Sequence, residues 1–297
     1  MNIHFKSIIA YQRSSIYLAV FALLVTALLM PASSNTSASV STPNVILFIG
    51  DGMGPQHIMA GGMYVHGAAG TLSFEGFPYT ATMTHNNASD STTDSAAGAT
   101  AMATGVKVDN GVVSMELPGS GAELTTLLEL HQAKNKRTGL VTTSYITDAT
   151  PSAFGAHEAD RSNKAEIAHD YLTQTRPNVL LGGGGNGFDE EAAQQAGYDL
   201  VTDLDGLREI ETETAAYVAG IFGGGELPPA EAPNRNSSLP TLPDMTQTAL
   251  DILDNDPDGF FLMVEHEGVD SHSHANNTMF MAQSMKELSE AVQVAVE

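Results

Sequence analysis

Residues 45–52 read VILFIGDG, a short apolar run that ends in a carboxylate between two glycines. Three similar runs follow, at residues 139–141 (GLV), 178–181 (NVLL) and 260–264 (FFLMV). Short, continuous apolar runs are typical of strands that are buried on both faces. Between them lie amphipathic stretches that indicate helices, at residues 122–133, 165–173 and 244–253. This alternation predicts an α/β fold with a mostly parallel central sheet and helices on both faces.

Polar side chains follow three of these runs at the point where each predicted strand ends. Asp51 follows the first run, Asp148 and Thr150 follow the second, and Glu265 follows the fourth. Ligands of open α/β sheets bind beyond the carboxyl ends of the strands, so we expect these side chains to converge. Taken alone, Asp51 is as compatible with a simple turn as with a ligand site.

Ser95 lies at the start of an alanine-rich stretch, after the cluster Asp90-Ser-Thr-Thr-Asp94. This pattern predicts a helix that begins near Ser95, where unpaired N–H groups and the helix dipole favour an anion. The residues alone leave a second interpretation open, in which Ser95 or Asp94 only caps the helix. No GxSxG motif is present, so a nucleophilic Ser95 would need activation by a metal ion.

Metal-binding residue types recur in the segment EHEGVDSHSH, residues 265–274. Asp270 and His274 are four residues apart and would share one face of a helix, as zinc ligands do. Glu265 suits magnesium, which prefers oxygen ligands. His266 and His272 point elsewhere and are interpreted as core or solvated histidines. Upstream, Arg161 offers a planar fork for two phosphate oxygens, although most single arginines lie on the surface.

Composition narrows the function classes. The sequence has no cysteine, which excludes disulfides, thiolate metal sites and cysteine nucleophiles. Lys6 and Arg13 precede an apolar run at residues 16–30 and then small residues, an order that predicts a cleaved signal peptide over residues 1–38 and no membrane anchor after cleavage. Its removal leaves ten basic residues against 35 acidic ones, a net charge of about −25. Such a charge disfavours nucleic acid as a partner.

Two glycine-rich segments are interpreted structurally. The run that contains Gly182, Gly184 and Gly187 matches a dinucleotide-binding pattern, but it lacks a βαβ context and is read as a backbone turn. Residues 222–243, rich in glycine and proline, are expected to form a long surface loop.

Together these motifs resemble the alkaline phosphatase family. The matching stretches run from about residue 44 to the end of the chain, in the family's order: NVILFIGDGMG, DSTTDSAAGATAMATG, TDATPSAFGAHEADR, NVLLGGGGNGF and LPDMTQTALDILDNDPDGFFLMVEHEGVDSHSHANN. The resemblance implies the family's three-layer fold, with residues 39–297 as the N-terminal portion of one domain. It also implies two zinc ions, one magnesium ion and small phosphate monoesters as substrates.

The resemblance implies a role for each matched residue. Ser95 resembles the nucleophile that forms phosphoserine, and Arg161 resembles the phosphate clamp, with Asp94 orienting it. The implied metal ligands are Asp51, shared by the second zinc ion and magnesium, Thr150 and Glu265 for magnesium, Ser95 for the second zinc ion, and Asp270 and His274 for the first. Asp148 resembles a residue that lies near the magnesium site without contacting the ion itself.

Three expectations remain. The family supplies an Asp-His pair and a further histidine to zinc from a later region that this sequence does not contain, so we expect the chain to be incomplete. The alternatives to a phosphomonoesterase are a phosphodiesterase of the same superfamily and a non-catalytic fragment that binds phosphate or metal. A periplasmic or extracellular location follows from the predicted signal peptide, and a homodimer is left open.

Overall fold

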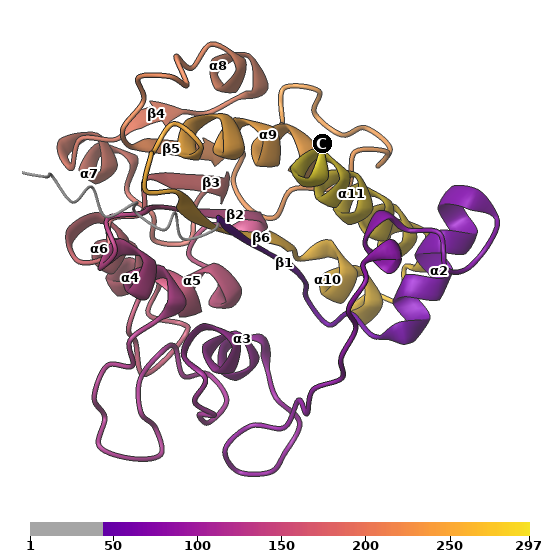
Figure 1. Ribbon diagram of the computed structural model, residues 1–297, viewed down its shortest axis with the longest axis horizontal. Helices are drawn as coiled ribbons and strands as arrows, with labels where there is room; N and C mark the ends of the chain where they lie inside the picture. Colours follow the sequence, from indigo (N-terminus) through magenta and orange to yellow (C-terminus); the bar gives the residue numbers. More distant parts are fainter. Residues whose placement is uncertain (1–43) are drawn as a thin grey trace, which may run out of the picture. The chain divides into compact units, whose positions relative to one another are not determined.

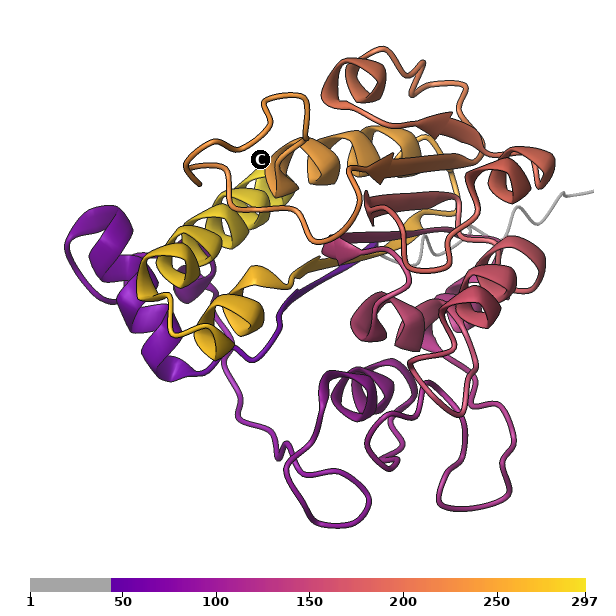
Figure 2. The ribbon, with the colours of Figure 1, turned by 180° about the vertical axis from the view of Figure 1, so that it is seen from behind.

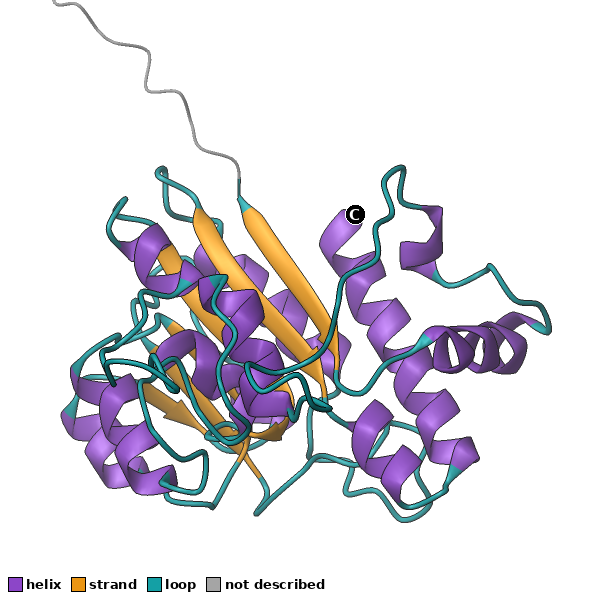
Figure 3. Ribbon diagram, turned by 90° about the horizontal axis from the view of Figure 1, so that it is seen from below, coloured by secondary structure: helices purple, strands orange, loops and turns teal. Residues whose placement is uncertain are grey.

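A single six-stranded sheet forms the centre of the computed structural model, which describes residues 44–297. The predicted signal peptide at residues 1–38 lies outside the described residues. All neighbouring strands are parallel, in the order β1-β6-β2-β3-β5-β4. Figure 3 shows the strands of the sheet in orange among the helices in purple. The strands are β1 (Val45–Gly50), β2 (Arg137–Tyr145), β3 (Val179–Gly183), β4 (Asp199–Val201), β5 (Val218–Phe222) and β6 (Phe260–His266).

Helices cover both faces of this sheet, which confirms the predicted fold class (Figure 1). One face packs against α3 (Ser95–Thr104), α4 (Leu127–Gln132), α5 (Ala149–Gly155), α6 (Lys164–Thr173) and α7 (Glu190–Gln195). The other packs against α8 (Leu204–Arg208), α9 (Leu242–Leu253) and α11 (Thr278–Val296). Helices α9 and α11 lie side by side on this second face (Figure 2).

Strand β6 shows how alternation along a strand positions the site. Phe261 and Met263 belong to the core on the α3–α7 face, whereas Leu262 and Val264 belong to the core under α9 and α11. Successive side chains of a strand point to opposite faces. Glu265 therefore follows Phe261 and Met263 toward the α3–α7 face.

A smaller apolar cluster lies beside the end of β1. It joins α11 to three short elements: α2 (Pro55–His66), the 3₁₀ helix η1 (Ser73–Gly76) and α10 (Gly268–His274). Its buried members are Leu72, Val269, Met281 and Met285. Within residues 44–297 no helix is both long and apolar enough to cross a bilayer.

The sequence misplaced the start of one helix and missed two strands. The helix expected over residues 122–133 begins only at Leu127, because Glu123 bridges to Met115 and Thr126 caps the helix. The Thr126 side chain accepts a hydrogen bond from the Glu129 N–H, and the Glu129 carboxylate accepts one from the Thr126 N–H, which fixes the helix start. Strands β4 and β5 were not predicted.

Candidate active site

The carboxyl ends of β1, β6 and β2 bring the predicted site residues to one edge of the sheet. Ile49 of β1 lies opposite Glu265 of β6, and Thr142 of β2 lies opposite Glu265 on its other side. Asp51 directly follows β1, and its N–H donates to the His266 carbonyl oxygen at 3.3 Å. The convergence expected from the sequence is therefore present.

Ser95 is the first residue of α3, as predicted, and its hydroxyl faces Asp51. Ser95 Oγ donates to Asp51 Oδ2 at 2.7 Å, which joins the start of a helix to the end of a strand. Asp94 is the residue that caps the helix: its carboxylate accepts from the Ala97 N–H at 2.9 Å. Because Asp94 does the capping, the Ser95 hydroxyl remains available for another role.

Arg161 lies between two carboxylates. Its guanidinium donates to Asp148 Oδ1 at 3.1 Å and to Asp94 Oδ2 at 3.4 Å. Asp148 also accepts from Ser144 Oγ at 2.7 Å, and Lys164 Nζ lies 3.4 Å from its Oδ1. Burial opposes ionisation of Asp148, but Ser144, Lys164 and Arg161 outweigh it and hold the pKa below its ordinary value. Arg161 keeps 31% of its side chain exposed and can therefore meet a ligand.

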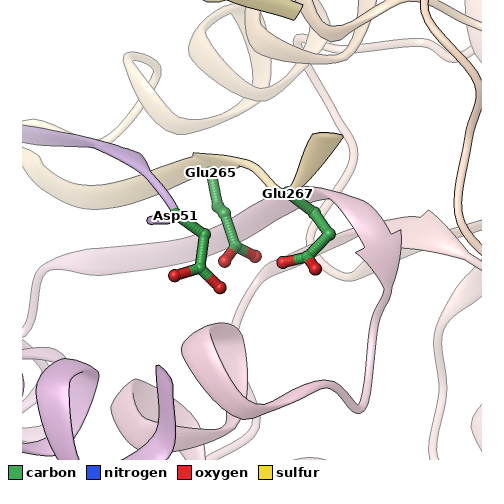
Figure 4. Close-up of side chains that lie close together, drawn as sticks. All are labelled: Asp51, Glu265 and Glu267. Carbon is green, nitrogen blue, oxygen red and sulfur yellow. The ribbon is translucent and has the colours of Figure 1, made fainter. Parts of the chain in front are cut away.

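Three carboxylates form a cluster below β1 and β6. One carboxylate oxygen from each of Asp51, Glu265 and Glu267 lies within 4.8 Å of the other two. Figure 4 shows the three side chains close together. Glu265 is buried, and its Oε2 accepts from Thr142 Oγ1 at 2.6 Å. Thr150, in the first turn of α5, is also buried, and its side chain interacts with the Glu265 carboxyl and favours the ionised form of that group. These hard oxygen donors fit a magnesium ion.

The cluster is costly to ionise without a cation. Burial, followed by the negative charge of Asp51, raises the pKa of the Glu265 carboxyl well above its ordinary value. Burial, followed by the charges of Glu265 and Asp51, raises the pKa of the Glu267 carboxyl to about 11. In the unfolded chain both groups would ionise at ordinary values near 4.3.

These shifts predict how stability depends on pH. Between pH 7.5 and about 9.5 an unfolded Glu267 has lost its proton while the folded one retains it, so the free energy of unfolding should fall as pH rises. Bound Mg²⁺ should abolish this trend, because it keeps the Glu267 carboxylate ionised in the folded protein as it is in the unfolded chain. Melting temperatures measured from pH 7.5 to 9.5, first with a chelator and then with Mg²⁺, check the expected fall in stability and its response to the ion. A metal-free protein that is as stable at pH 9.5 as at pH 7.5 would contradict the expected fall.

Asp270 and His274 share one face of α10, as predicted. His274 Nε2 lies 3.3 Å from Asp270 Oδ2, and 82% of the His274 side chain is exposed. A carboxylate and an imidazole that face one another in this way are donor types that zinc uses. The backbone at Gly52 makes room for Asp270: Gly52 has φ +61°, and a Cβ there would lie 2.3 Å from Asp270 Oδ1.

The two remaining histidines of this segment are not part of the cluster. His266 is buried on the opposite face from Glu265, with Nε2 3.7 Å from Glu287 Oε2 of α11. The ring of His272 packs edge-on against Phe280, and burial lowers its pKa. His266 is thus a core histidine, one of the two interpretations that the sequence left open for it.

Glu267 and Lys164 are site residues that the sequence reasoning missed. The signal for Glu267 was its spacing, because a residue two positions after Glu265 stays on the same face while the chain remains extended. The signal for Lys164 was its place three residues after Arg161. Lys164 was overlooked because it lies outside the stretches that carried the family resemblance, whereas Glu267 lies within one of them but the resemblance implied no role for it.

The fold and site together define a class of α/β protein that gathers a candidate metal cluster, a serine and an arginine at one sheet edge. The alkaline phosphatase family model matches residues 42–297, and the chain belongs to that family. It is 36% identical to alkaline phosphatase 3 of Bacillus subtilis strain 168, over 86% of this chain and 57% of that protein.

Solved structures agree with this assignment. The cold-active alkaline phosphatase of a psychrophilic Shewanella species superposes with a TM-score of 0.72 at 31% identity, over 86% of this chain and 64% of that one. A mutant of TAB5 alkaline phosphatase with Mg bound gives a TM-score of 0.71 at 26% identity, over 85% and 72%. The chain spans 57–60% of the length of the two Bacillus subtilis relatives that it matches.

Proposed function

We propose that the protein containing this chain hydrolyses phosphate monoesters through a phosphoserine at Ser95. The observation that carries the proposal is the 2.7 Å hydrogen bond from Ser95 Oγ, at the N-terminus of α3, to Asp51. It gives a serine hydroxyl both an acceptor beside it and a helix N-terminus that favours anions. Family membership supports the same reaction.

The residues of the chain would act in two displacement steps. In the first, Ser95 Oγ attacks phosphorus and gives up its proton to solvent, the ester P–O bond breaks, and the departing oxygen takes up a proton and leaves as the alcohol. In the second, water attacks the phosphoserine and gives up a proton, the Oγ–P bond breaks, Ser95 Oγ takes up a proton, and inorganic phosphate leaves. Arg161, oriented by Asp94 and Asp148, would bind two non-bridging oxygens throughout both steps.

The proposed metal ions are those implied by the family resemblance. Asp51, Thr150 and Glu265 would hold magnesium; Asp270 and His274 would hold one zinc ion; Asp51 and Ser95 would hold the other. When bound, these ions would supply positive charge that favours the serine alkoxide, the departing alcohol oxygen and an ionised attacking water. The domain assignment at residues 39–297 and export to the periplasm or medium are part of this proposal, and N-terminal sequencing of the mature protein checks the export.

A comparison of monoester and diester substrates tests the proposed reaction. With zinc and magnesium present, 4-nitrophenyl phosphate should be hydrolysed much faster than bis(4-nitrophenyl) phosphate, because Arg161 is placed to bind two free phosphate oxygens. Preference for the diester would favour a phosphodiesterase. Binding of phosphate without turnover of either substrate would favour a non-catalytic protein.

Arg161 gives a prediction about phosphate affinity. In Arg161→Ala the inhibition constant for inorganic phosphate should rise about ten- to a hundredfold, because a charge-assisted contact contributes roughly 1.5–3 kcal/mol. Steady-state inhibition assays measure the change, and magnesium titration should show that the metal cluster is intact. Arg208→Ala is a suitable control, since that guanidinium is 63% exposed and pairs with Asp244. Unchanged phosphate affinity in Arg161→Ala would contradict the clamp role.

A further inference from the structure

Glu267 is not needed by the magnesium ligand set proposed above, yet its carboxylate lies in the same cluster. Ligand oxygens of Glu267, Asp51 and Glu265 are all within 4.8 Å of one another. Figure 4 shows the three side chains leaving the ends of β1 and β6 on the same side of the sheet. Oxygens on opposite sides of one Mg²⁺ or Ca²⁺ ion are about 4.0–5.2 Å apart, so one cation can contact all three carboxylates.

A second observation indicates that the cluster is built for a ligand. Glu265 is only 1% exposed, and its Oε1 has no hydrogen-bond partner of regular geometry among the residues that the structure describes. Its other oxygen is already held by Thr142, which leaves Oε1 as the atom available to the cluster. Leaving a buried carboxylate oxygen without a partner is costly, and a cation would remove that cost.

The nearby basic side chains do not neutralise the cluster. Arg161 and Lys164 direct their donors to Asp148 and Asp94. Across residues 44–297, the ion pairs of the structure include none of Asp51, Glu265 or Glu267. Three carboxylates in a largely buried site therefore face one another without a positive charge between them.

The backbone holds Glu267 in this position. Its N–H donates to Thr143 Oγ1 of β2 at 2.9 Å, immediately after the last residue of β6. The carbonyl oxygen of Glu267 accepts the Asp270 N–H at 2.9 Å, at the start of α10. These two contacts fix the Glu267 Cα at the sheet edge, so its carboxylate is presented to the cluster by regular structure.

We propose that Glu267 is a third carboxylate ligand of the divalent cation between Asp51 and Glu265. The cation is a hard one that prefers oxygen, with Mg²⁺ as the probe. The proposal rests on the magnesium site of the proposed function and adds a ligand to it. Glu267 contributes a negative charge that raises cation affinity and takes a position that water would otherwise fill.

Calorimetric titration of metal-stripped protein with MgCl₂ tests this ligand. Glu267→Gln keeps the size of the side chain and removes its charge, and it should weaken Mg²⁺ binding by about tenfold or more. It should also reduce the rise in melting temperature that Mg²⁺ produces. The metal-free variant should melt no lower than wild type, because glutamine replaces a side chain of the same size that is uncharged in the metal-free folded protein at neutral pH. Glu226→Gln is the matched control: this exposed carboxylate accepts from Ser271 Oγ at 2.6 Å and should leave Mg²⁺ affinity unchanged.

Glu267→Asp is a second test variant, to be used if Glu267→Gln does not fold. It keeps the charge on a side chain one methylene shorter, and it should bind Mg²⁺ with an affinity between those of wild type and Glu267→Gln. Glu267→Gln with wild-type Mg²⁺ affinity and the full thermal shift would overturn the proposal and leave Glu267 as a protonated neighbour of Asp51. A wild-type protein that binds no Mg²⁺ would overturn it together with the magnesium site, whereas the phosphoserine at Ser95 is tested independently.

Discussion

Ser95→Ala should lose the phosphoenzyme completely and should lower turnover of phosphate monoesters by roughly a thousandfold or more. The reason is geometric: within the start of α3, only the Ser95 hydroxyl is bonded to Asp51, and alanine leaves no oxygen to attack phosphorus. Labelled monoester is mixed with the protein, the reaction is stopped with acid, and the labelled peptide is sequenced. Residual turnover would come from binding and electrostatic stabilisation that the substitution leaves in place.

Ser89→Ala is the matched control for this experiment. Ser89 lies six residues upstream on an exposed loop, and its hydroxyl donates to Asp109, outside the site. This variant should keep both the label and the rate. Label on a peptide without Ser95, or a labelled Ser95→Ala protein, would refute the nucleophile assignment. Retained Mg²⁺ binding in Ser95→Ala would show that the loss comes from chemistry and not from unfolding.

Gly52→Ala should disrupt the site more than its size suggests. The position has φ +61°, where a side chain costs about 1–2 kcal/mol in backbone strain. The new Cβ would also lie 2.3 Å from Asp270 Oδ1, so either the loop after β1 or the Asp270 side chain must move. We expect a lower melting temperature, loss of zinc binding at Asp270 and His274, and nearly complete loss of turnover. Thermal unfolding, zinc titration with a competing chelator, and monoester assays measure the three effects.

Gly67→Ala is the control that separates the effect of backbone strain from that of the steric clash with Asp270. Gly67 has φ +70° at the end of α2, and a Cβ added there would meet nothing within 4 Å. It should therefore lose a similar amount of stability from strain alone, with zinc binding and turnover unchanged. If Gly52→Ala behaved like Gly67→Ala, the close approach of Asp270 to Gly52 would have no part in holding Asp270 in its proposed role as a zinc ligand.

Much of the fold followed from local patterns, and the exceptions have physical causes. Strands β1, β3 and β6 carry runs of large apolar residues, so their burial is visible in the sequence. Strand β2 reads RTGLVTTSY, and only its apolar centre at residues 139–141 was visible, because its other buried residues are small or polar. Strand β5 reads VAGIF, and its alanine and glycine weaken the apolar signal although every residue is buried. The start of α4 was misplaced because the capping by Thr126 and the bridge from Glu123 to Met115 override an amphipathic pattern that continues upstream.

The site was predictable where chemistry coincides with a strand end or a helix start. Asp51, Glu265 and Ser95 occupy such positions, and the structure brings them together. Their catalytic and metal-binding roles stay predictions. Glu267 was not predicted because its interpretation depends on how far the extended backbone continues past Glu265, which only the contact with Thr143 fixes. The position of Lys164 depends on the turn between α5 and α6, which no local pattern of residues predicted.

The pairing of β1 with β6 has a consequence for how the protein is made. Val45 lies opposite Phe261, so Asp51 meets Glu265 and Glu267 only after almost the whole described chain has been synthesised. Contacts between residues so distant in sequence form late, because the loop between them must close first. A cation therefore cannot guide the early stages of folding. Binding of the proposed cation would therefore require that β1 and β6, the first and last strands within residues 44–297, have already paired.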